Sequence, residues 1–337
     1  MGITIKDVAE KAGVATSTVS RVINNSVSIS EKTKNKVNQV MDELGYTPNS
    51  AARNLGKGRA NSVALILPPL KSREEMSIPF FLEIIESINE EAQHCGLSVS
   101  LAIAKNFSDL LSNVKRMHAQ KQVDGFILLY SNVEDPVADY LYKNKLNFSL
   151  VGLPCDRKNK ITYVDNNNKL LGHDATDYLI KKGHKNILFV TNRIKENVHL
   201  ERFEGYKQAM SSAGLNFFEP VNIESETDFL DFSLVLEKSK ITAVVIIEDL
   251  LAFKVMQYVK HIGYMLPQQL SVISFNNTIF STLSHPYITN VDINISLLAK
   301  YSFQYVIEQI NGKNSCGMKS FVPHKVIEHE SVTVLSN

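Results

Sequence analysis

The 337-residue sequence contains only three cysteines and no long apolar run. Cys95, Cys155 and Cys316 are odd in number, far apart and without C-x-x-C spacing, which argues against a disulfide framework and against a zinc site. No stretch of about 18 apolar residues could span a bilayer, so we expect no membrane partner. The first twelve residues lack the basic start and apolar core of a signal peptide, and a cytoplasmic location is expected.

Sequence motifs that mark catalysis are also absent. The chain has no G-x-S-x-G, no Walker loop and no H-E-x-x-H, and the glycine pair at Gly56 and Gly58 continues to Asn61 where a dinucleotide-binding loop needs a third glycine. His324 and His329 are five residues apart, which places them on opposite faces of a strand and disfavours a metal pair. We therefore expect no enzyme activity, no cofactor and no metal.

Net charge is small overall but unevenly distributed. The formal total is +1. Residues 1–60 hold nine basic and five acidic side chains, whereas the remaining chain holds 27 basic and 30 acidic ones. A basic head on a mildly acidic body is typical of a protein that meets DNA at one end. The hydrophobic fraction of 44% and the charged fraction of 21% fit a globular protein with a sizeable core.

The first 44 residues predict three short helices. Thr4, followed three residues later by Asp7, resembles a capping box, and apolar residues then recur at helical spacing until Gly13 ends the first helix. A third helix begins after the N-cap Ser30 and runs through Leu44. Its apolar residues complete a three-helix core.

A second helix, over about residues 16–23, presents apolar side chains on one side and only hydrogen-bonding side chains on the other. Ala9, Gly13 and Val19 have the spacing of a helix-turn-helix, in which helices cross at a small residue, turn at a glycine and close on an apolar residue. The alternative, a small helical bundle with an incidental polar face, is the weaker interpretation of this spacing.

After Gly45 the pattern changes. Pro48 breaks the chain, Asn49 can serve as an N-cap, and SAARNL, ending at Leu55, supplies about one and a half helical turns before two glycines. A helix this short is marginal alone in water, so it should form only when something holds it.

Together, the helix-turn-helix, the third helix and this hinge resemble the lactose-repressor (LacI/GalR) family. That resemblance implies that Thr16, Ser17 and Arg21 read bases in the major groove, with Arg21 suited to bidentate contact with guanine. It also implies that Leu55 wedges into a minor-groove step when the hinge folds on operator DNA. Ala15 departs from the family, whose members usually have serine there. The remaining DNA-contacting positions that the resemblance assigns are Thr4, Thr18, Ser20, Asn24, Asn49 and Ala52.

From residue 62 onward, apolar strand-like runs alternate with helical patterns. The first series occupies residues 62–153, and it restarts after Asp165. Such alternation predicts an α/β fold of doubly wound parallel sheets with ligands at the carboxyl ends of the strands. The resemblance implies two lobes like those of periplasmic sugar-binding proteins, with Asp165 and Asn166 starting a helix.

We expect a DNA-binding domain over 1–47, a hinge helix and linker over 48–60, and a two-lobed effector-binding and dimerisation domain over 61–337. The first lobe is expected at about 61–161 plus 278–293, and the second at about 162–277 plus 294–337.

The resemblance places a small ligand between the lobes. Arg202, in E-R-F-E-G-Y, falls at the family's arginine that forks onto sugar hydroxyls or a carboxylate; the alternative is a surface arginine. Asp249 and Asn276 end apolar strands at ligand-contacting positions, although either could equally make an ordinary Asx-turn, and relatives usually have Asp at the second. Of Phe80 and Phe81, one is expected in the cleft and one in the core.

These features favour a transcriptional repressor that binds a palindromic operator on double-stranded DNA as a homodimer and responds to a small sugar. Within the family, segments such as LLYSNVEDP (128–136) and HKVIEH (324–329) look most like the maltose-operon repressors of Gram-positive bacteria. One alternative is a catabolite-type regulator controlled by a phosphocarrier protein. Another, a sugar-binding transport protein, is opposed by the helix-turn-helix.

Overall fold

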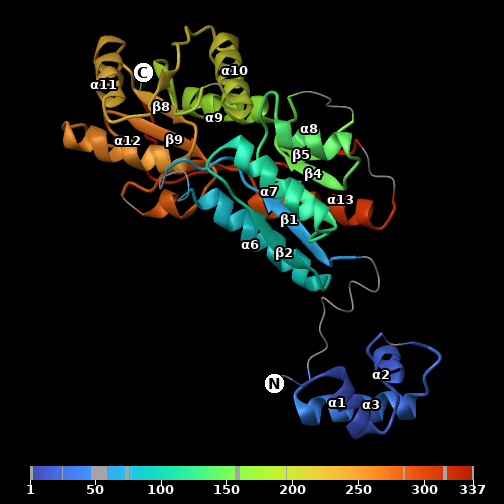
Figure 1. Cartoon of the computed structure of the whole chain (residues 1–337). Helices are drawn as coiled ribbons and strands as arrows, with labels where there is room; N and C mark the ends of the chain where they lie inside the picture. The colour runs from blue at the N-terminus through green and yellow to red at the C-terminus, as the bar shows by residue number, and fades with distance from the viewer. Residues whose placement is uncertain are drawn as a thin grey trace. The chain divides into compact units, whose positions relative to one another are not determined.

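The computed structural model describes residues 3–24, 26–46, 59–72, 76, 78–155, 160–194, 196–283, 285–313 and 317–335. Its contacts divide the chain into two compact units, Met1–Ala60 and Asn61–Asn337. In the residues that the structure describes, the first unit contains three helices and no strand, and the second contains two six-stranded sheets with their helices (Figure 1). Within the described residues, no helix is long and apolar enough to cross a membrane.

The head contains the three predicted helices, α1 (Ile5–Ala12), α2 (Thr16–Ile23) and α3 (Glu31–Leu44). At the start of α1, the Thr4 backbone N–H and hydroxyl donate to Asp7 Oδ2 at 2.7 and 2.8 Å. Gly13 and Gly45 end α1 and α3 in the left-handed conformation, at φ of 63° and 64°, which glycine adopts without steric cost. Ser30 caps α3 by accepting from the Thr33 N–H. The helix-turn-helix spacing is therefore confirmed.

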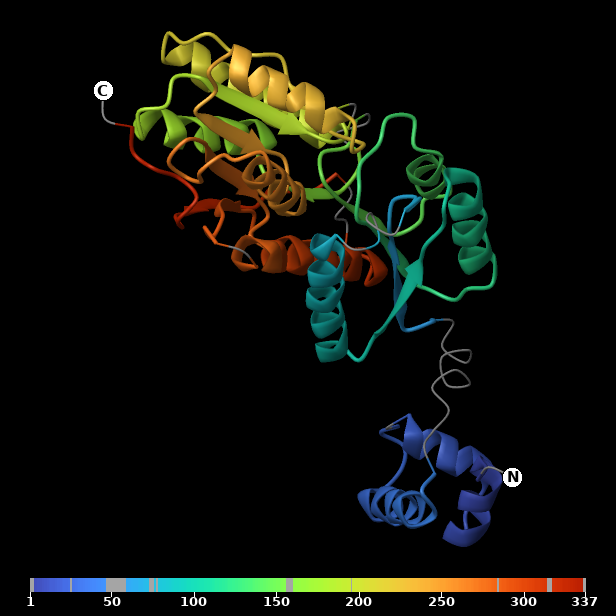
Figure 2. The same cartoon turned by 90° about the vertical axis from the view of Figure 1, so that its left-hand side faces the viewer.

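The first sheet is parallel, with the order β11-β5-β4-β3-β1-β2. Side chains of β1 alternate between two cores: Val63 and Leu65 face the cluster that includes α6, and Ala64 and Ile66 face the cluster of α7 and α8. Figure 2 shows α13 crossing α6 beside this sheet. Its elements are β1 (Ser62–Ile66), α6 (Pro79–His94), β2 (Ser98–Ala102), α7 (Phe107–Ala119), β3 (Gly125–Leu128), α8 (Pro136–Lys143), β4 (Phe148–Val151), β5 (Tyr163–Asp165), α13 (Ile295–Ile310) and β11 (Lys319–Phe321).

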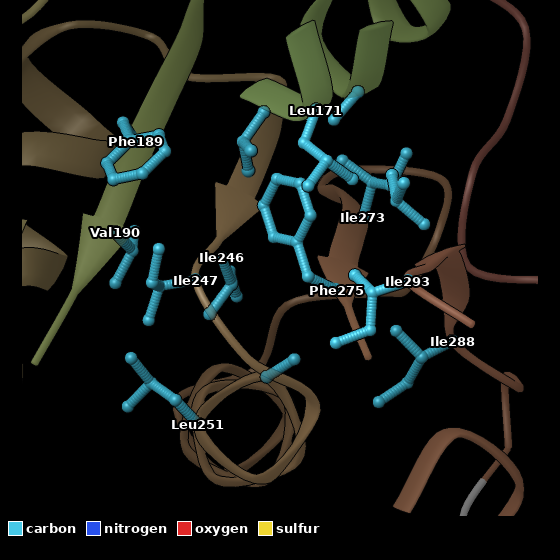
Figure 3. Packing of buried hydrophobic residues seen from close by; sticks show 14 of the residues in the cluster. Leu171, Phe189, Val190, Ile246, Ile247, Leu251, Ile273, Phe275, Ile288 and Ile293 are labelled. Atoms are coloured by element: carbon cyan, nitrogen blue, oxygen red, sulfur yellow. The ribbon is translucent and has the colours of Figure 1, made fainter. Parts of the chain in front are cut away.

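The second sheet has the order β12-β10-β9-β8-β6-β7 and is parallel except for the β10–β12 pair. Leu171 of α9, Leu251 of α12 and Phe275 of β9 belong to one buried cluster (Figure 3). The short β7 and the helix α11 were not anticipated from the sequence. Its elements are α9 (Asn168–Lys181), β6 (Ile187–Thr191), α10 (Asn197–Ser212), β7 (Val221–Asn222), α11 (Asp228–Lys238), β8 (Ala243–Ile246), α12 (Asp249–His261), β9 (Ser271–Phe275), the 3-10 helix η1 (Ile279–Thr282), β10 (Thr289–Asp292) and β12 (Lys325–Ile327).

The chain crosses between the two sheets three times, and two crossings differ from the expected lobe boundaries. The segment 278–293, expected in the first lobe, supplies β10 to the second sheet. Conversely, α13 and β11, expected in the second lobe, belong with the first sheet, and only β12 returns to the second. The expectation was wrong because a strand's sequence pattern does not specify which sheet edge will pair with it.

The three crossing segments follow β5, β10 and β11. Asn166, in the first of them, is hydrogen-bonded to the other two. Its buried amide Nδ2 donates to Ile293 O at 2.9 Å and to Val322 O at 3.0 Å, in the other two crossing segments. The expectation that Asp165 and Asn166 start a helix was also wrong. Asp165 ends β5, and Asn167 is the N-cap of α9.

Candidate functional site

The exposed side of α2 carries the residues expected to read DNA. Val19 and Val22 are buried in the head's core, which leaves Thr16, Ser17 and Arg21 exposed on the outer side. The α2 residues form this two-sided helix because apolar and polar positions alternate at a period of 3.6. An exposed α-helix face of this kind fits the major groove.

The other expected DNA-contacting residues of the head surround this face. Asn24 is exposed and its Nδ2 donates to Ser20 O at 2.8 Å, whereas Thr18 and Ser20 are half-buried. Ala15 is the N-cap of α2 and gives no side-chain capping bond, consistent with a methyl group where a hydroxyl could accept one. The expected hinge contacts Asn49, Ala52 and Leu55 lie outside the described residues.

In the body, Arg202 of α10 is buried and not a surface arginine, with 5% of its area exposed. Its Nε donates to Asn168 Oδ1 at 3.0 Å and its Nη1 to Ile247 O at 2.9 Å. The guanidinium also lies 4.4 Å from the Phe275 ring centroid, within range of a cation–π contact. Burial lowers the Arg202 pKa to about 10, so the group remains charged at neutral pH.

Three buried carboxylates lie close to this guanidinium or to one another. Asp165 and Glu248 interact electrostatically with Arg202, and Asp249 interacts with Glu248. Asp165 accepts from Asn168 Nδ2 at 3.0 Å, and its burial raises its pKa to about 7. Asp249, the first residue of α12, accepts from the Thr278 N–H at 2.6 Å, and burial raises its pKa to about 6. The third carboxylate, Glu248, is also buried. The hydrogen bond of Asp249 therefore reaches the loop that follows β9, and Asp249 does not make a local Asx-turn.

Glu248 precedes Asp249 and was not among the expected effector-binding residues. Its Oε1 accepts from Asn192 Nδ2 at 2.7 Å, and its Oε2 lies 3.5 Å from Arg193 Nη2. Asn192 Oδ1, Arg193 Nε and Thr278 Oγ1 are buried without a hydrogen-bond partner, and all three follow β6 or β9. Buried polar atoms are usually paired, so unpaired atoms after β6 and β9, the two strands that flank β8 in the sheet, indicate a place for a polar ligand.

A cavity of about 510 Å³ opens beside the end of β9 and beside two of the crossing segments. Its polar lining comes from α6, from the end of β9 and from two crossings, and includes Glu83, Asn276, Asn277, Asp292, His324 and Lys325. The volume is within the range of small-molecule sites. His324 Nε2 lies 3.0 Å from Asp174 Oδ2, so this histidine is already engaged by a carboxylate.

Of the five expected effector-binding residues, Asn276 lines this cavity. Arg202 and Asp249 lie buried in the adjacent network and are not among its lining residues. Phe80 and Phe81 are both half-buried, pack edge to face at 5.5 Å and contact the large core cluster, so the expected split between cleft and core is not seen.

Strand-end position could have revealed Asp292, which ends β10, but not Glu83 or Lys325. Those two come from the helix α6 and from the start of β12, and only the folded chain brings them together. Among the residues that the structure describes, no group of three or more His, Cys, Asp or Glu side chains is arranged to hold a metal ion.

A helix-turn-helix head followed by a two-lobed α/β body with a polar cavity defines a class of ligand-responsive regulators. Residues 4–49 match the model for bacterial regulatory proteins of the lacI family, and residues 176–332 match a periplasmic binding protein-like domain. The chain is 32% identical to the HTH-type transcriptional regulator MalR of Streptococcus pneumoniae serotype 4 over 338 residues, covering 97% of this chain and all of the relative.

Two further comparisons are informative. The catabolite control protein A of Priestia megaterium is 30% identical over 297 residues, covering 86% of this chain and 87% of the relative. The fold superposes with a TM-score of 0.82 on a lac repressor dimer bound to operator, at 20% identity and covering 99% of this chain and all of that one.

The chain therefore belongs to the lacI family of bacterial regulatory proteins. It is a DNA-binding transcriptional regulator and not an enzyme.

Proposed function

We propose that the protein represses a maltose or maltodextrin utilisation operon and leaves its operator when a small sugar binds between the lobes. The polar cavity at the crossing segments is the observation that carries this proposal, because its lining is rich in amide and carboxylate groups that suit sugar hydroxyls. The choice of maltose is supported by the segments 128–136 and 324–329 and by the likeness to a solved structure described as a probable maltose operon transcriptional repressor. A cytoplasmic location follows from the need to reach operator DNA.

On the DNA side, Thr16, Ser17 and Arg21 are proposed to read base edges. The head residues Thr4, Thr18, Ser20 and Asn24 are proposed to fix its register on the phosphate backbone. The hinge residues Asn49, Ala52 and Leu55 are proposed to act in the minor groove.

A homodimer supplies the second head that a palindromic operator needs, because one head contacts only a half-site. The solved lac repressor dimer bound to operator has the same fold and supports this arrangement. In the present chain, β2 is an edge strand. Leu101 within it and Ile103 just after it are exposed. An exposed apolar edge strand invites pairing or coverage, and a second copy of the chain is the proposed occupant.

The proposed response depends on the crossing segments. Asn166 ties all three together, so a ligand that changes the angle between the sheets changes every crossing at once. Closure would alter how two first lobes of a dimer hold their paired hinges, and a helix as short as SAARNL is sensitive to such spacing.

The test is a titration of a labelled operator complex with maltose, maltotriose, glucose 6-phosphate and a phosphocarrier protein. We expect maltose or maltotriose to weaken operator binding by about 1 to 3 kcal/mol, the usual range of allosteric coupling. Operator must weaken sugar binding by the same factor, which provides an internal control. A change produced by the phosphocarrier protein alone would reject sugar induction and favour the catabolite-type alternative, which the Priestia megaterium relative supports.

The Arg21 side chain provides a separate test of the DNA-reading face. Because this exposed guanidinium can donate to guanine O6 and N7, Arg21→Ala should lose about 1 to 3 kcal/mol on the operator and much less on random DNA. The measurement is a pair of binding isotherms at one salt concentration, with the exposed α3 residue Lys32→Ala as the control. Equal losses on both DNAs would make Arg21 a phosphate contact instead.

A further inference from the structure

Carboxylates from two elements line the cavity. Glu83, on α6 of the first sheet's lobe, and Asp292, at the end of β10 in the second, both line it. Burial raises the Glu83 pKa, and the negative charges of Asp249, Glu86 and Asp292 raise it further. Glu83 therefore senses the charge of carboxylates that belong to the opposite lobe.

The nearby basic side chains leave little positive charge available to a ligand in the cavity. Arg202 already donates to Asn168 and to a backbone carbonyl. His324 is held by Asp174 at 3.0 Å. Among the described residues that line the cavity, Lys325 alone carries a permanent positive charge, against the two carboxylates of Glu83 and Asp292.

The hydrogen-bonding groups of the lining also favour an uncharged ligand over an anionic one. An ionised carboxylate only accepts hydrogen bonds, and the amides of Asn276, Asn277 and Asn294 can both donate and accept. A sugar hydroxyl can donate to the carboxylates and accept from the amides. A phosphate group at neutral pH would bring a charge of about −2 close to Glu83 and Asp292, and among the described lining residues only Lys325 would compensate it.

We propose that the cavity selects uncharged carbohydrates and rejects their phosphorylated forms, with Glu83 and Asp292 as the residues that determine this specificity. The inference rests on the proposed function, since it concerns the sugar that this cavity would bind. It adds that phosphorylation of the sugar would abolish the signal.

The test compares maltose with maltose 6′-phosphate by calorimetric titration of the full-length protein. Like-charge repulsion in a partly buried site should make the wild type bind maltose at least about 30-fold more tightly than the phosphate. In the double variant Glu83→Gln, Asp292→Asn, that ratio should fall by at least about tenfold, because the shape is kept and the charge is removed. Glu90→Gln, an exposed carboxylate on the same helix α6, is the matched control and should leave the ratio unchanged.

The outcomes separate this inference from the proposed function. If wild-type protein binds both sugars equally, or if the double variant keeps the wild-type ratio, the charge selection is overturned while sugar binding stands. Tighter binding of maltose 6′-phosphate that Lys325→Gln abolishes would identify a phosphate site and also overturn it. If no sugar binds the wild type, the proposed function fails and the inference fails with it.

Discussion

Replacing Gly172 by alanine is expected to destabilise the second lobe by about 3 kcal/mol or more, as strong overpacking does. Gly172 of α9 and Gly205 of α10 lie where these two helices cross. A Cβ on Gly172 would come within 1.9 Å of Arg202 O, and a Cβ on Gly205 within 2.0 Å of Lys169 O. Both contacts are with backbone atoms, so no side-chain rotation relieves them, and the helices would have to separate.

The sign of this effect is diagnostic. In an isolated helix, glycine to alanine stabilises by about 1 kcal/mol, so a loss must come from the crossing of α9 and α10. The measurement is a urea titration followed by far-ultraviolet circular dichroism, with the exposed α10 residue Ser212→Ala as the control. Unchanged or increased stability would mean that the helices can move apart at little cost.

Replacing Arg202 by alanine is expected to cost about 3 to 5 kcal/mol of stability and to abolish the response to sugar, because removing one partner leaves buried charges uncompensated. The carboxylates of Asp165 and Glu248 both interact electrostatically with this guanidinium, and the Asn168 amide oxygen and Ile247 carbonyl would lose their donor. The same residue therefore supports the fold and borders the proposed ligand site.

Two measurements separate these roles. Arg202→Ala should lower the midpoint of urea unfolding of the body. Without urea and without sugar, the variant should still bind operator, because Arg202 lies outside the head and hinge. Arg116→Ala, an exposed arginine on α7, is the control and should change neither stability nor response by a measurable amount. An Arg202→Ala protein with wild-type stability and no response to sugar would assign this residue to ligand binding alone, and one with wild-type stability and a wild-type response would contradict both roles.

The cavity lies between parts of the body that belong to different lobes. Its lining combines α6 of one lobe with strand ends of the other and with two crossing segments. A ligand there contacts the parts of the body that must move relative to one another if the lobes close. Under the proposed function, such a ligand would bind the open and closed arrangements of the lobes with different affinity, which a change of conformation on binding requires.

The local sequence determined the head and most of the body's helices and strands. Ser30, Gly13 and Gly45 act as the caps that their residue types predict, because capping depends on side chains within a few positions of the helix end. The apolar runs of β1, β3, β6 and β8 are buried strands for a similar reason, since strands covered on both faces need no alternation.

Other features were decided by tertiary structure. Sequence pattern could not reveal that β10 joins the second sheet or that α13 returns to α6, because pairing partners are set by the whole sheet. Nor could it place Glu83 beside Asp292, which are 209 positions apart. Arg202 was recognised by its motif, but its burial among carboxylates arises from the crossing of α9 and α10. By itself, the sequence determined the kind of protein, since helix-turn-helix spacing and strand–helix alternation are local. Only long-range packing decided which charged side chains line the cavity.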